Sequence, residues 1–200
     1  MAKLEFFYGV MNSSKTTNLL QVDFNYKELG YKPLIIKPCL DTRDGEQKGV
    51  GTIQSRLIKE GRECLYVSSL DEVYKDLRDA FSNKKYDVLF VDEVQFFSET
   101  DICILADICD SYDIPVLCYG LKTDSNGNLF KASGKLFAIS DKQTEVKQVC
   151  KCGKKAIMHV RLVNGKPVLN DSSVAVEDGK VEYRSVCRKC WKELTGSNLL

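Results

Sequence analysis

Short runs of apolar residues alternate along the first 120 positions with longer segments whose apolar residues recur at helical spacing. The apolar runs cover residues 4–8, 33–37, 88–91 and 116–119. The segments of helical spacing cover residues 16–29, 70–81 and 102–109. Strands that are apolar throughout are typical of parallel sheets, which are buried on both faces. The alternation therefore predicts an α/β fold in which helices cover both faces of a parallel sheet.

Residues next to these elements give further local predictions. Gly30 directly follows the first helical segment, and Ser69 and Glu72 have the spacing of a capping box at the start of the second. Residues 41–51 contain three glycines and several charges without an apolar period, which is typical of a loop that projects from the sheet. Residues 129–139 show no clean period, so we assign them no regular element.

Composition narrows the class of protein. The 200 residues are 44% hydrophobic, which suffices for one main domain with a small appendix. Lys and Arg number 29 against 28 for Asp and Glu, so the net charge of +1 gives no support for nucleic acid or an anionic membrane as a partner. No apolar run reaches membrane-spanning length and the first residues lack a basic leader, so we expect a cytoplasmic protein with reduced thiols.

The sequence Gly-Val-Met-Asn-Ser-Ser-Lys-Thr at residues 9–16 joins the first predicted strand to the first predicted helix. It matches the phosphate-binding loop G-x-x-x-x-G-K-[ST], except that Ser14 replaces the second glycine. In such a loop the backbone N–H groups surround phosphates, Lys15 meets the phosphate oxygens and the Thr16 hydroxyl ligates Mg²⁺. An alternative stays open, in which Ser13 or Ser14 caps an ordinary helix.

Residues 86–93 form an apolar strand that ends in Asp92 and Glu93. In a fold with a phosphate loop, Asp92 suits the binding of Mg²⁺, and Glu93 suits the acceptance of a proton from an attacking hydroxyl, which favours a kinase. Read alone, the two acids have a simpler explanation as solvated side chains. The residues predicted to bind a nucleotide are Gly9, Val10, Met11, Asn12, Ser13, Ser14, Lys15, Thr16, Asp92, Glu93, Val94 and Gln95.

Nine cysteines include two close pairs near the end of the chain. They are Cys150 with Cys152, and Cys187 with Cys190, and a hairpin signal, Asn164-Gly165, lies between the pairs. Two such knuckles flanking a hairpin predict a structural zinc site with four thiolate ligands and no position for water. The alternative is four unpaired structural cysteines.

Two domains follow from these patterns. Residues 1–142 are predicted to form a nucleotide-binding α/β domain, and residues 143–200 a zinc-binding domain. His159, the single histidine, lies on a predicted strand. A role as a base or a zinc ligand is open to it, but a structural role is commoner for an isolated strand histidine.

Five ordered motifs carry a resemblance to a known family. They are Gly9-x-Met11-x-Ser13-x-Lys15-Thr16, Asp41-Thr42-Arg43, Val91-Asp92-Glu93-Val94-Gln95-Phe96-Phe97, Cys118-Tyr119-Gly120-Leu121 and Tyr183-Arg184-Ser185-Val186-Cys187-Arg188-x-Cys190. Together these motifs span nearly the whole chain. In them the chain resembles the type II thymidine kinases, most closely the bacterial branch. The resemblance implies a RecA-like core with a zinc ribbon and a lasso loop over the nucleoside.

What the resemblance implies for activity is transfer of the γ-phosphate of ATP to the 5′-hydroxyl of thymidine or deoxyuridine. It also implies Mg²⁺ with ATP, a structural zinc ion, a homotetramer and feedback inhibition by dTTP. By the same resemblance Glu93 is the general base and Arg43 approaches the transferring phosphoryl group, where a guanidinium stabilises developing charge. The substrate-binding residues implied are Met11, Asp41, Arg43, Phe96, Leu121, Phe130, Val174 and Tyr183.

The chain departs from the family pattern in three places. They are Ser14 in the phosphate loop, Ser125 where the family generally has Phe, and residues 176–179 in place of an I-G-G loop. Two rival functions also fit parts of the chain: a phosphate-loop NTP hydrolase that switches conformation, and a zinc-ribbon module that binds nucleic acid. The basic residues that the second rival would use are Lys147, Lys151, Lys154, Lys155, Arg184, Arg188 and Lys189.

Overall fold

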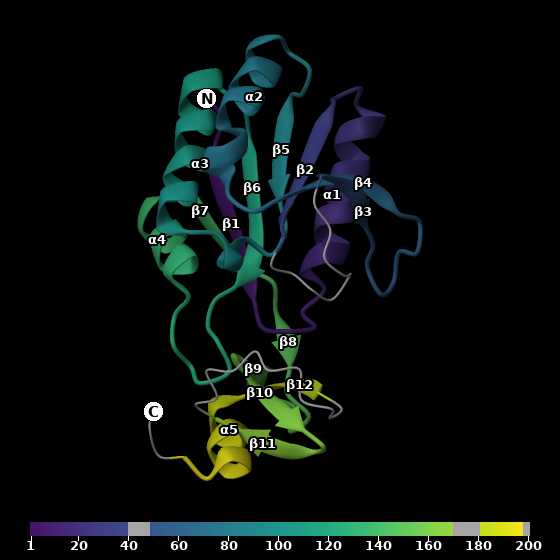
Figure 1. Cartoon of the computed structure of the whole chain (residues 1–200). Coiled ribbons are helices and arrows are strands. Elements are labelled where there is room, and N and C mark those ends of the chain that lie inside the picture. Colours follow the sequence, from purple (N-terminus) through teal and green to yellow (C-terminus); the bar gives the residue numbers. More distant parts are fainter. Residues whose placement is uncertain (40–48, 170–180, 198–200) are drawn as a thin grey trace.

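A computed structural model describes residues 1–39, 49–169 and 181–197. Its large domain is built on a seven-stranded sheet of order β3-β4-β2-β5-β6-β1-β7 (Figure 1). The strands are β1 (Leu4–Gly9), β2 (Pro33–Pro38), β3 (Gly49–Ile53), β4 (Arg62–Val67), β5 (Val88–Val91), β6 (Val116–Leu121) and β7 (Lys142–Glu145). Six of them are parallel, and β3 alone runs antiparallel to its neighbour β4.

Helices cover both faces of this sheet, as predicted. Helices α2 (Leu70–Ser82), α3 (Glu99–Tyr112) and α4 (Lys131–Ile139) bury their apolar side chains against one face. Helix α1 (Lys15–Glu28) covers the other face, where Leu19 and Leu20 pack on side chains of β2, β5 and β6. The predicted P-loop type of α/β fold is confirmed, since β1 leads into α1 through residues 10–14.

The helix ends follow from local sequence. Gly30 has a φ of +85° after α1, a conformation that glycine adopts without strain. The Ser69 hydroxyl caps α2 by accepting from the Asp71 N–H, so Glu72 does not complete the expected capping box there. A full capping box occurs instead at the start of α3, between Ser98 and Asp101.

Four α-helices and β-strands of the large domain were not predicted. Strand β7 has the sequence Lys-Gln-Thr-Glu, which has no apolar residue because β7 is an edge strand. Strand β3 contains two glycines, and it shows that residues 49–51 are strand, so the loop prediction for 41–51 is wrong there; residues 41–48 lie outside the described part. Strand β4 begins with two charged residues. Helix α4 buries Ala132, Ser133 and Leu136, and the small residues obscure its period.

The small domain follows β7 and contains two further sheets. Strands β8 (Gln148–Val149) and β9 (Lys155–Ala156) form one, and β10 (Met158–Val163), β11 (Lys166–Val168) and β12 (Val181–Val186) form the other in the order β11-β10-β12. Asn164 and Gly165 have φ values of +50° and +77° between β10 and β11, which confirms the predicted hairpin. Helix α5 (Arg188–Thr195) packs on β10 through the buried Trp191.

The division at residues 142 and 143 stays a prediction. Strand β7 pairs with β1, so the main sheet extends to Glu145.

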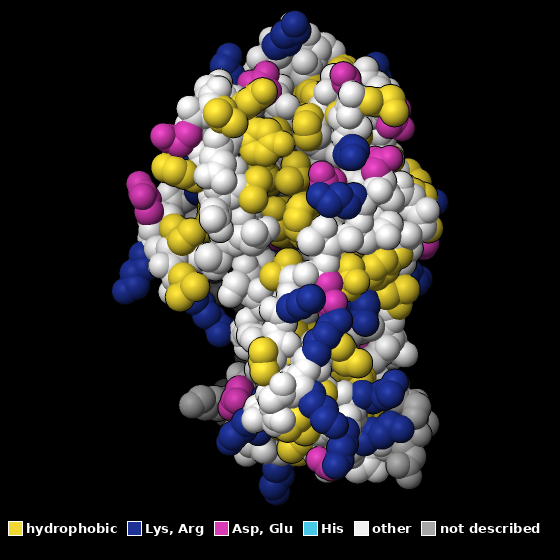
Figure 2. Space-filling model, turned by 180° about the vertical axis from the view of Figure 1, so that it is seen from behind, with side chains coloured by type: hydrophobic (Ala, Val, Ile, Leu, Met, Phe, Trp, Pro, Cys, Tyr) yellow, Lys and Arg dark blue, Asp and Glu magenta, His cyan; other side chains and the backbone are white. Residues whose placement is uncertain are grey.

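Figure 2 shows Lys and Arg side chains gathered on the small domain in a view from behind, and apolar side chains exposed on the large domain. In the described part of the chain no helix is both long and apolar enough to cross a membrane.

Candidate active site

The loop between β1 and α1 has the backbone of a phosphate-binding loop. Asn12 and Ser14 have φ values of +60° and +65°, in the left-handed region. A Cβ on Gly9 would lie 2.5 Å from Ser13 Oγ and 2.7 Å from the Val146 carbonyl oxygen, so only glycine fits there. Ser14 precedes the helix but makes no side-chain capping bond, which contradicts the alternative that it caps an ordinary helix.

Lys15 and Thr16 are the first residues of α1, and their side chains donate hydrogen bonds to different partners. The buried Lys15 ammonium donates to the Val10 carbonyl oxygen at 2.9 Å, within its own loop. The Thr16 hydroxyl donates to Asp92 Oδ2 at 3.0 Å, although the two residues lie 76 positions apart. The structure therefore brings together the two side chains that were predicted to ligate Mg²⁺.

Asp92 lies at the end of β5 and is 1% exposed. Burial, and then the charge of Glu93, raise the pKa of Asp92 to about 7, while Lys37, Thr16 and Lys15 lower it. Its Oδ1 has no hydrogen-bond partner among the described residues. A buried carboxylate oxygen of this kind, beside a hydroxyl, is suited to a bound cation.

Glu93 follows in a left-handed backbone conformation, with φ of +52°, at the start of a short 3₁₀ turn over Val94–Phe96. Gln95 Nε2 donates to Glu93 Oε2 at 2.6 Å, and Gln95 Oε1 accepts from the Leu121 N–H at 2.9 Å. The buried Gln95 thus fixes the orientation of the Glu93 carboxylate relative to β6. A non-glycine residue with positive φ costs about 1–3 kcal/mol, and such strain is frequent at active sites.

These side chains face one cleft with a volume of about 360 Å³. Its lining residues are Met11, Asn12, Ser13, Ser14, Lys15, Thr16, Thr17, Lys37, Gln54, Ser55, Arg56, Leu57, Asp92 and Glu93. The sequence did not lead us to predict Thr17, Lys37 or residues 54–57 at this cleft. Lys37 had a usable signal, because it lies at the carboxyl end of a parallel strand, where ligands bind in open α/β sheets. Residues 54–57 follow β3, which had itself been missed.

The residues expected to contact a nucleoside lie in several places. The rings of Phe96 and Phe130 meet edge to face, with centroids 6.2 Å apart. Tyr183 is 37% exposed and meets the His159 ring edge to face at 6.1 Å. Leu121 is buried behind Gln95. Three other predicted residues, Asp41, Arg43 and Val174, lie outside the described residues.

His159 is buried on β10, and its Nδ1 has no hydrogen-bond partner among the described residues. Burial and the positive charge of Lys15 lower the pKa of His159 to about 4, against a smaller opposite effect of Asp124. The imidazole is therefore neutral at pH 7. His159 is not part of the cysteine cluster that is described below, so a role as a zinc ligand has no support.

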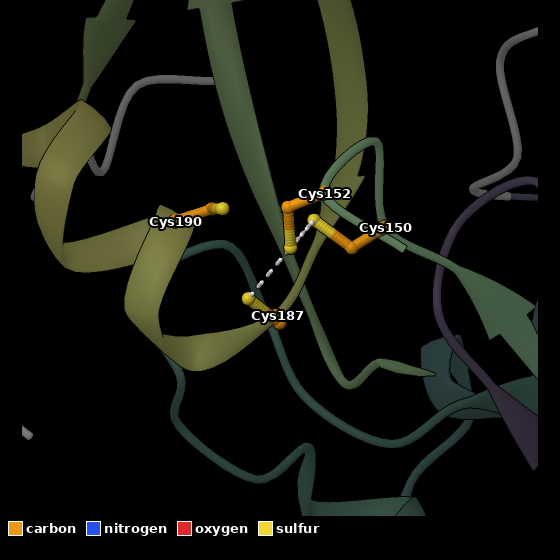
Figure 3. A group of neighbouring side chains, drawn as sticks. All are labelled: Cys150, Cys152, Cys187 and Cys190. Carbon is orange, nitrogen blue, oxygen red and sulfur yellow. Dashed lines mark hydrogen bonds between the residues drawn. The ribbon is translucent and has the colours of Figure 1, made fainter. Parts of the chain in front are cut away.

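Four thiols meet between the two cysteine knuckles, which come from the loop after β8 and from the start of α5 (Figure 3). The sulfur atoms of Cys150, Cys152, Cys187 and Cys190 all lie within 4.8 Å of one another. Cys152 Sγ is 3.5 Å from Cys150 Sγ and 3.6 Å from Cys187 Sγ, too far for a disulfide. Four ligands bound tetrahedrally at about 2.3 Å would place sulfur atoms about 3.8 Å apart, so the cluster fits a metal ion.

The chemistry of the thiols agrees with metal binding. Burial alone would raise the pKa of Cys150, but hydrogen bonds from the backbone N–H groups of Cys152 and Cys187 lower it. The pKa of Cys187 is lowered chiefly by a backbone hydrogen bond from Cys190. Thiolates are the form that binds metal, so these donors favour metal binding at Cys150 and Cys187, whereas contacts with the Cys152 and Cys187 thiols raise the pKa of Cys190 to about 12.

The basic residues of the small domain are partly neutralised. Lys155 pairs with Glu145, Arg184 with Glu182, and Lys189 with Glu193 at 3.6 Å. These pairs occur on the domain where Figure 2 shows Lys and Arg side chains gathered. They reduce the positive field that a nucleic-acid-binding module would need.

The fold and the cleft define a phosphate-loop nucleotide-binding protein with a separate four-thiol cluster. A family model described as thymidine kinase matches residues 2–191, and the chain belongs to the thymidine kinase family. The kinase prediction drawn from the ordered motifs is thereby confirmed.

Curated relatives agree over almost their whole length. A thymidine kinase of Enterobacteria phage T4 is 42% identical, with 98% of each chain covered. One of Francisella tularensis (strain SCHU S4 / Schu 4) is 37% identical, over 96% of this chain and 98% of the relative. A thymidine kinase of Rhodopirellula baltica is 40% identical, over 96% of this chain and 89% of the relative. A solved Pif1 helicase of Candida albicans gives a TM-score of 0.43 at 13% identity, covering 74% of this chain and 36% of that chain.

Proposed function

We propose that the protein transfers the γ-phosphate of ATP to the 5′-hydroxyl of thymidine, and of deoxyuridine, to give the monophosphate and ADP. The observation that carries the proposal is the meeting of Lys15, Thr16, Asp92 and Glu93 at one cleft in a member of this family. A hydrolase needs to position only water, whereas a kinase needs a base for its acceptor hydroxyl.

The phosphate loop would bind the phosphates of ATP through its backbone N–H groups. On binding, the Lys15 ammonium would exchange the Val10 carbonyl for phosphate oxygens. Thr16 and Asp92 would hold Mg²⁺, and Asp92 Oδ1 is the buried oxygen that suits this role. The ion would neutralise charge on the β- and γ-phosphates.

Glu93 would accept the proton of the 5′-hydroxyl as it attacks phosphorus. Gln95 holds one carboxylate oxygen, Oε2, through a hydrogen bond, so the other oxygen is oriented by that contact. Arg43 would stabilise the charge that develops on the transferring phosphoryl group, and Asp41 would fix the loop that carries Arg43. These two roles rest on the family resemblance.

The nucleoside would bind beside the Glu93 end of the cleft. Phe96 and Phe130 form one aromatic contact and Tyr183 a second, and stacking on a base is typical of such rings. Met11, Leu121 and Val174 complete the proposed pocket.

We further propose that the four thiolates bind zinc, in the small domain that follows β7. Four protein ligands close the tetrahedron, so the ion would be structural and take no part in the reaction. A cytoplasmic homotetramer that dTTP inhibits is proposed from the resemblance. Light scattering of the purified protein, with and without dTTP, tests the assembly.

The central test is the release of ADP from ATP and Mg²⁺, measured without nucleoside and then with thymidine, deoxyuridine, deoxycytidine or deoxyadenosine. The proposal expects release with thymidine and deoxyuridine only. Release without any nucleoside would establish a hydrolase instead. No release in any sample, together with no ATP binding in a direct titration, would contradict the proposed function, either because Ser14 disables the phosphate loop or because the family resemblance misleads.

A further inference from the structure

Three consecutive residues of the phosphate loop are held by the small domain. The Val10 side chain is buried in the apolar cluster of that domain. The Met11 carbonyl oxygen accepts a hydrogen bond from Ser185 Oγ on β12. The Asn12 carbonyl oxygen accepts one from Gln148 Nε2 on β8 at 2.6 Å. The donors lie 174 and 136 positions along the chain from their acceptors, so these contacts are tertiary.

The two donors occupy equivalent positions relative to the thiol cluster. Gln148 lies two residues before Cys150, and Ser185 lies two residues before Cys187. Each donor is on a strand whose chain continues directly into a cluster cysteine. Fixing the four sulfur atoms on one metal ion therefore also fixes the two strands that hold the loop.

The loop has a physical need for such support. Asn12 and Ser14 both have left-handed backbone conformations, which residues other than glycine keep only where the surroundings hold them. The backbone N–H groups must also converge on the phosphates before the ligand binds, since ordering them on binding would weaken affinity. The contacts to Met11 and Asn12 lie within this strained part of the loop.

We propose that Gln148 and Ser185 are positioning residues of the nucleotide site, which hold the phosphate loop in its binding conformation through the Met11 and Asn12 carbonyl groups. The inference rests on the proposed function, because ATP is the ligand of that loop. Neither residue is among the described residues that line the cleft, so both act through the backbone they hold.

The experiment uses the full chain with its metal bound. The variants Gln148→Met and Ser185→Ala remove one donor each with little change in volume, and a double variant removes both. Hydrogen–deuterium exchange over residues 9–17 is measured without nucleotide, and the ATP Kd is measured by titration. We expect faster exchange in each variant and a Kd raised about five-fold in each single variant and about twenty-fold in the double variant.

Controls separate positioning from a general loss of structure. Gln143→Met and Ser140→Ala remove a matched amide and hydroxyl that bond each other away from the loop, and they should leave exchange in residues 9–17 unchanged. Ser185→Thr keeps the hydroxyl and should restore the Kd. Metal content should stay at the wild-type ratio in the Gln148→Met variant, and its KM for ATP should rise while kcat changes little.

Each outcome decides the inference. Unchanged exchange over residues 9–17 in Gln148→Met and in the double variant would show that the small domain does not hold the loop. Faster exchange with an ATP Kd within two-fold of wild type would overturn the positioning role. A wild-type protein that binds no ATP would instead contradict the proposed function, while the exchange data would still report on the loop.

Discussion

The phosphate loop and the thiol cluster are both built for charged ligands, yet they differ in how complete they are. The cluster offers four donors within 4.8 Å of one another, which is a full tetrahedral set. The phosphate site keeps its lysine on a loop carbonyl and leaves a buried carboxylate oxygen without a described partner. The four donors of the cluster suit an ion that stays bound. The phosphate site has polar groups left for a ligand, which suits a nucleotide that binds and leaves.

Removing the proposed metal ion should have the largest effect on stability, and it tests the four-thiol cluster. Structural zinc stabilises small domains by on the order of 10 kcal/mol, so a chelator should unfold the region around Cys150 and Cys187. Exchange should rise over residues 150–163 while strands β5 and β6 stay protected. Unchanged exchange in both regions would show that the fold around the four cysteines does not depend on a bound metal ion.

Replacing the proposed base should have the next largest effect, and this effect should be confined to turnover at the phosphate site. Glu93→Gln keeps the shape and the contact with Gln95 but removes the proton acceptor, so kcat should fall about 10²- to 10⁴-fold. The ATP Kd should remain near the wild-type value by titration. Near-normal turnover would remove Glu93 from that role.

Acid should weaken the small domain through His159. Because the pKa of this histidine is about 4 in the folded protein and about 6.5 unfolded, its neutral form gives full stability above pH 6.5, which is lost as the pH falls toward 4. At pH 5 the loss is about 2 kcal/mol. Denaturant unfolding of wild type and His159→Gln at pH 7.5 and 5 checks this, and equal pH dependence would contradict it.

Relieving strain in the loop should give the smallest effect. Ser14→Gly removes a left-handed serine, so the free energy of unfolding should rise by about 1 kcal/mol and the Tm by about 2–4 °C. Activity should be kept or raised. Asn12→Gly is the matched comparison, with a smaller gain because asparagine tolerates this conformation better. An unchanged fold with a sharply lower kcat/KM in Ser14→Gly would contradict the prediction.

The same two regions show what sequence can predict. Strands β1, β2, β5 and β6 were found because burial makes them largely apolar, with Glu5 and Lys37 as the charged exceptions. The loop and the cysteine pairs were found because their chemistry needs fixed spacing. Strand β7 escaped because an edge strand tolerates polar residues. The contacts of Gln148 and Ser185 could not be predicted, since their acceptors are backbone carbonyls that any residue supplies.

The position of β1 in the sheet has a consequence for synthesis. This strand is made before both of its partners, since it pairs with β6 and β7, whose residues follow more than 100 positions later. A nascent chain therefore exposes an apolar strand until its partners leave the ribosome, which is a hazard for aggregation and a reason for slow folding. Because Ser185 donates a hydrogen bond to the Met11 carbonyl oxygen, the phosphate loop at residues 9–16 can complete its contacts only after residue 185 has been made.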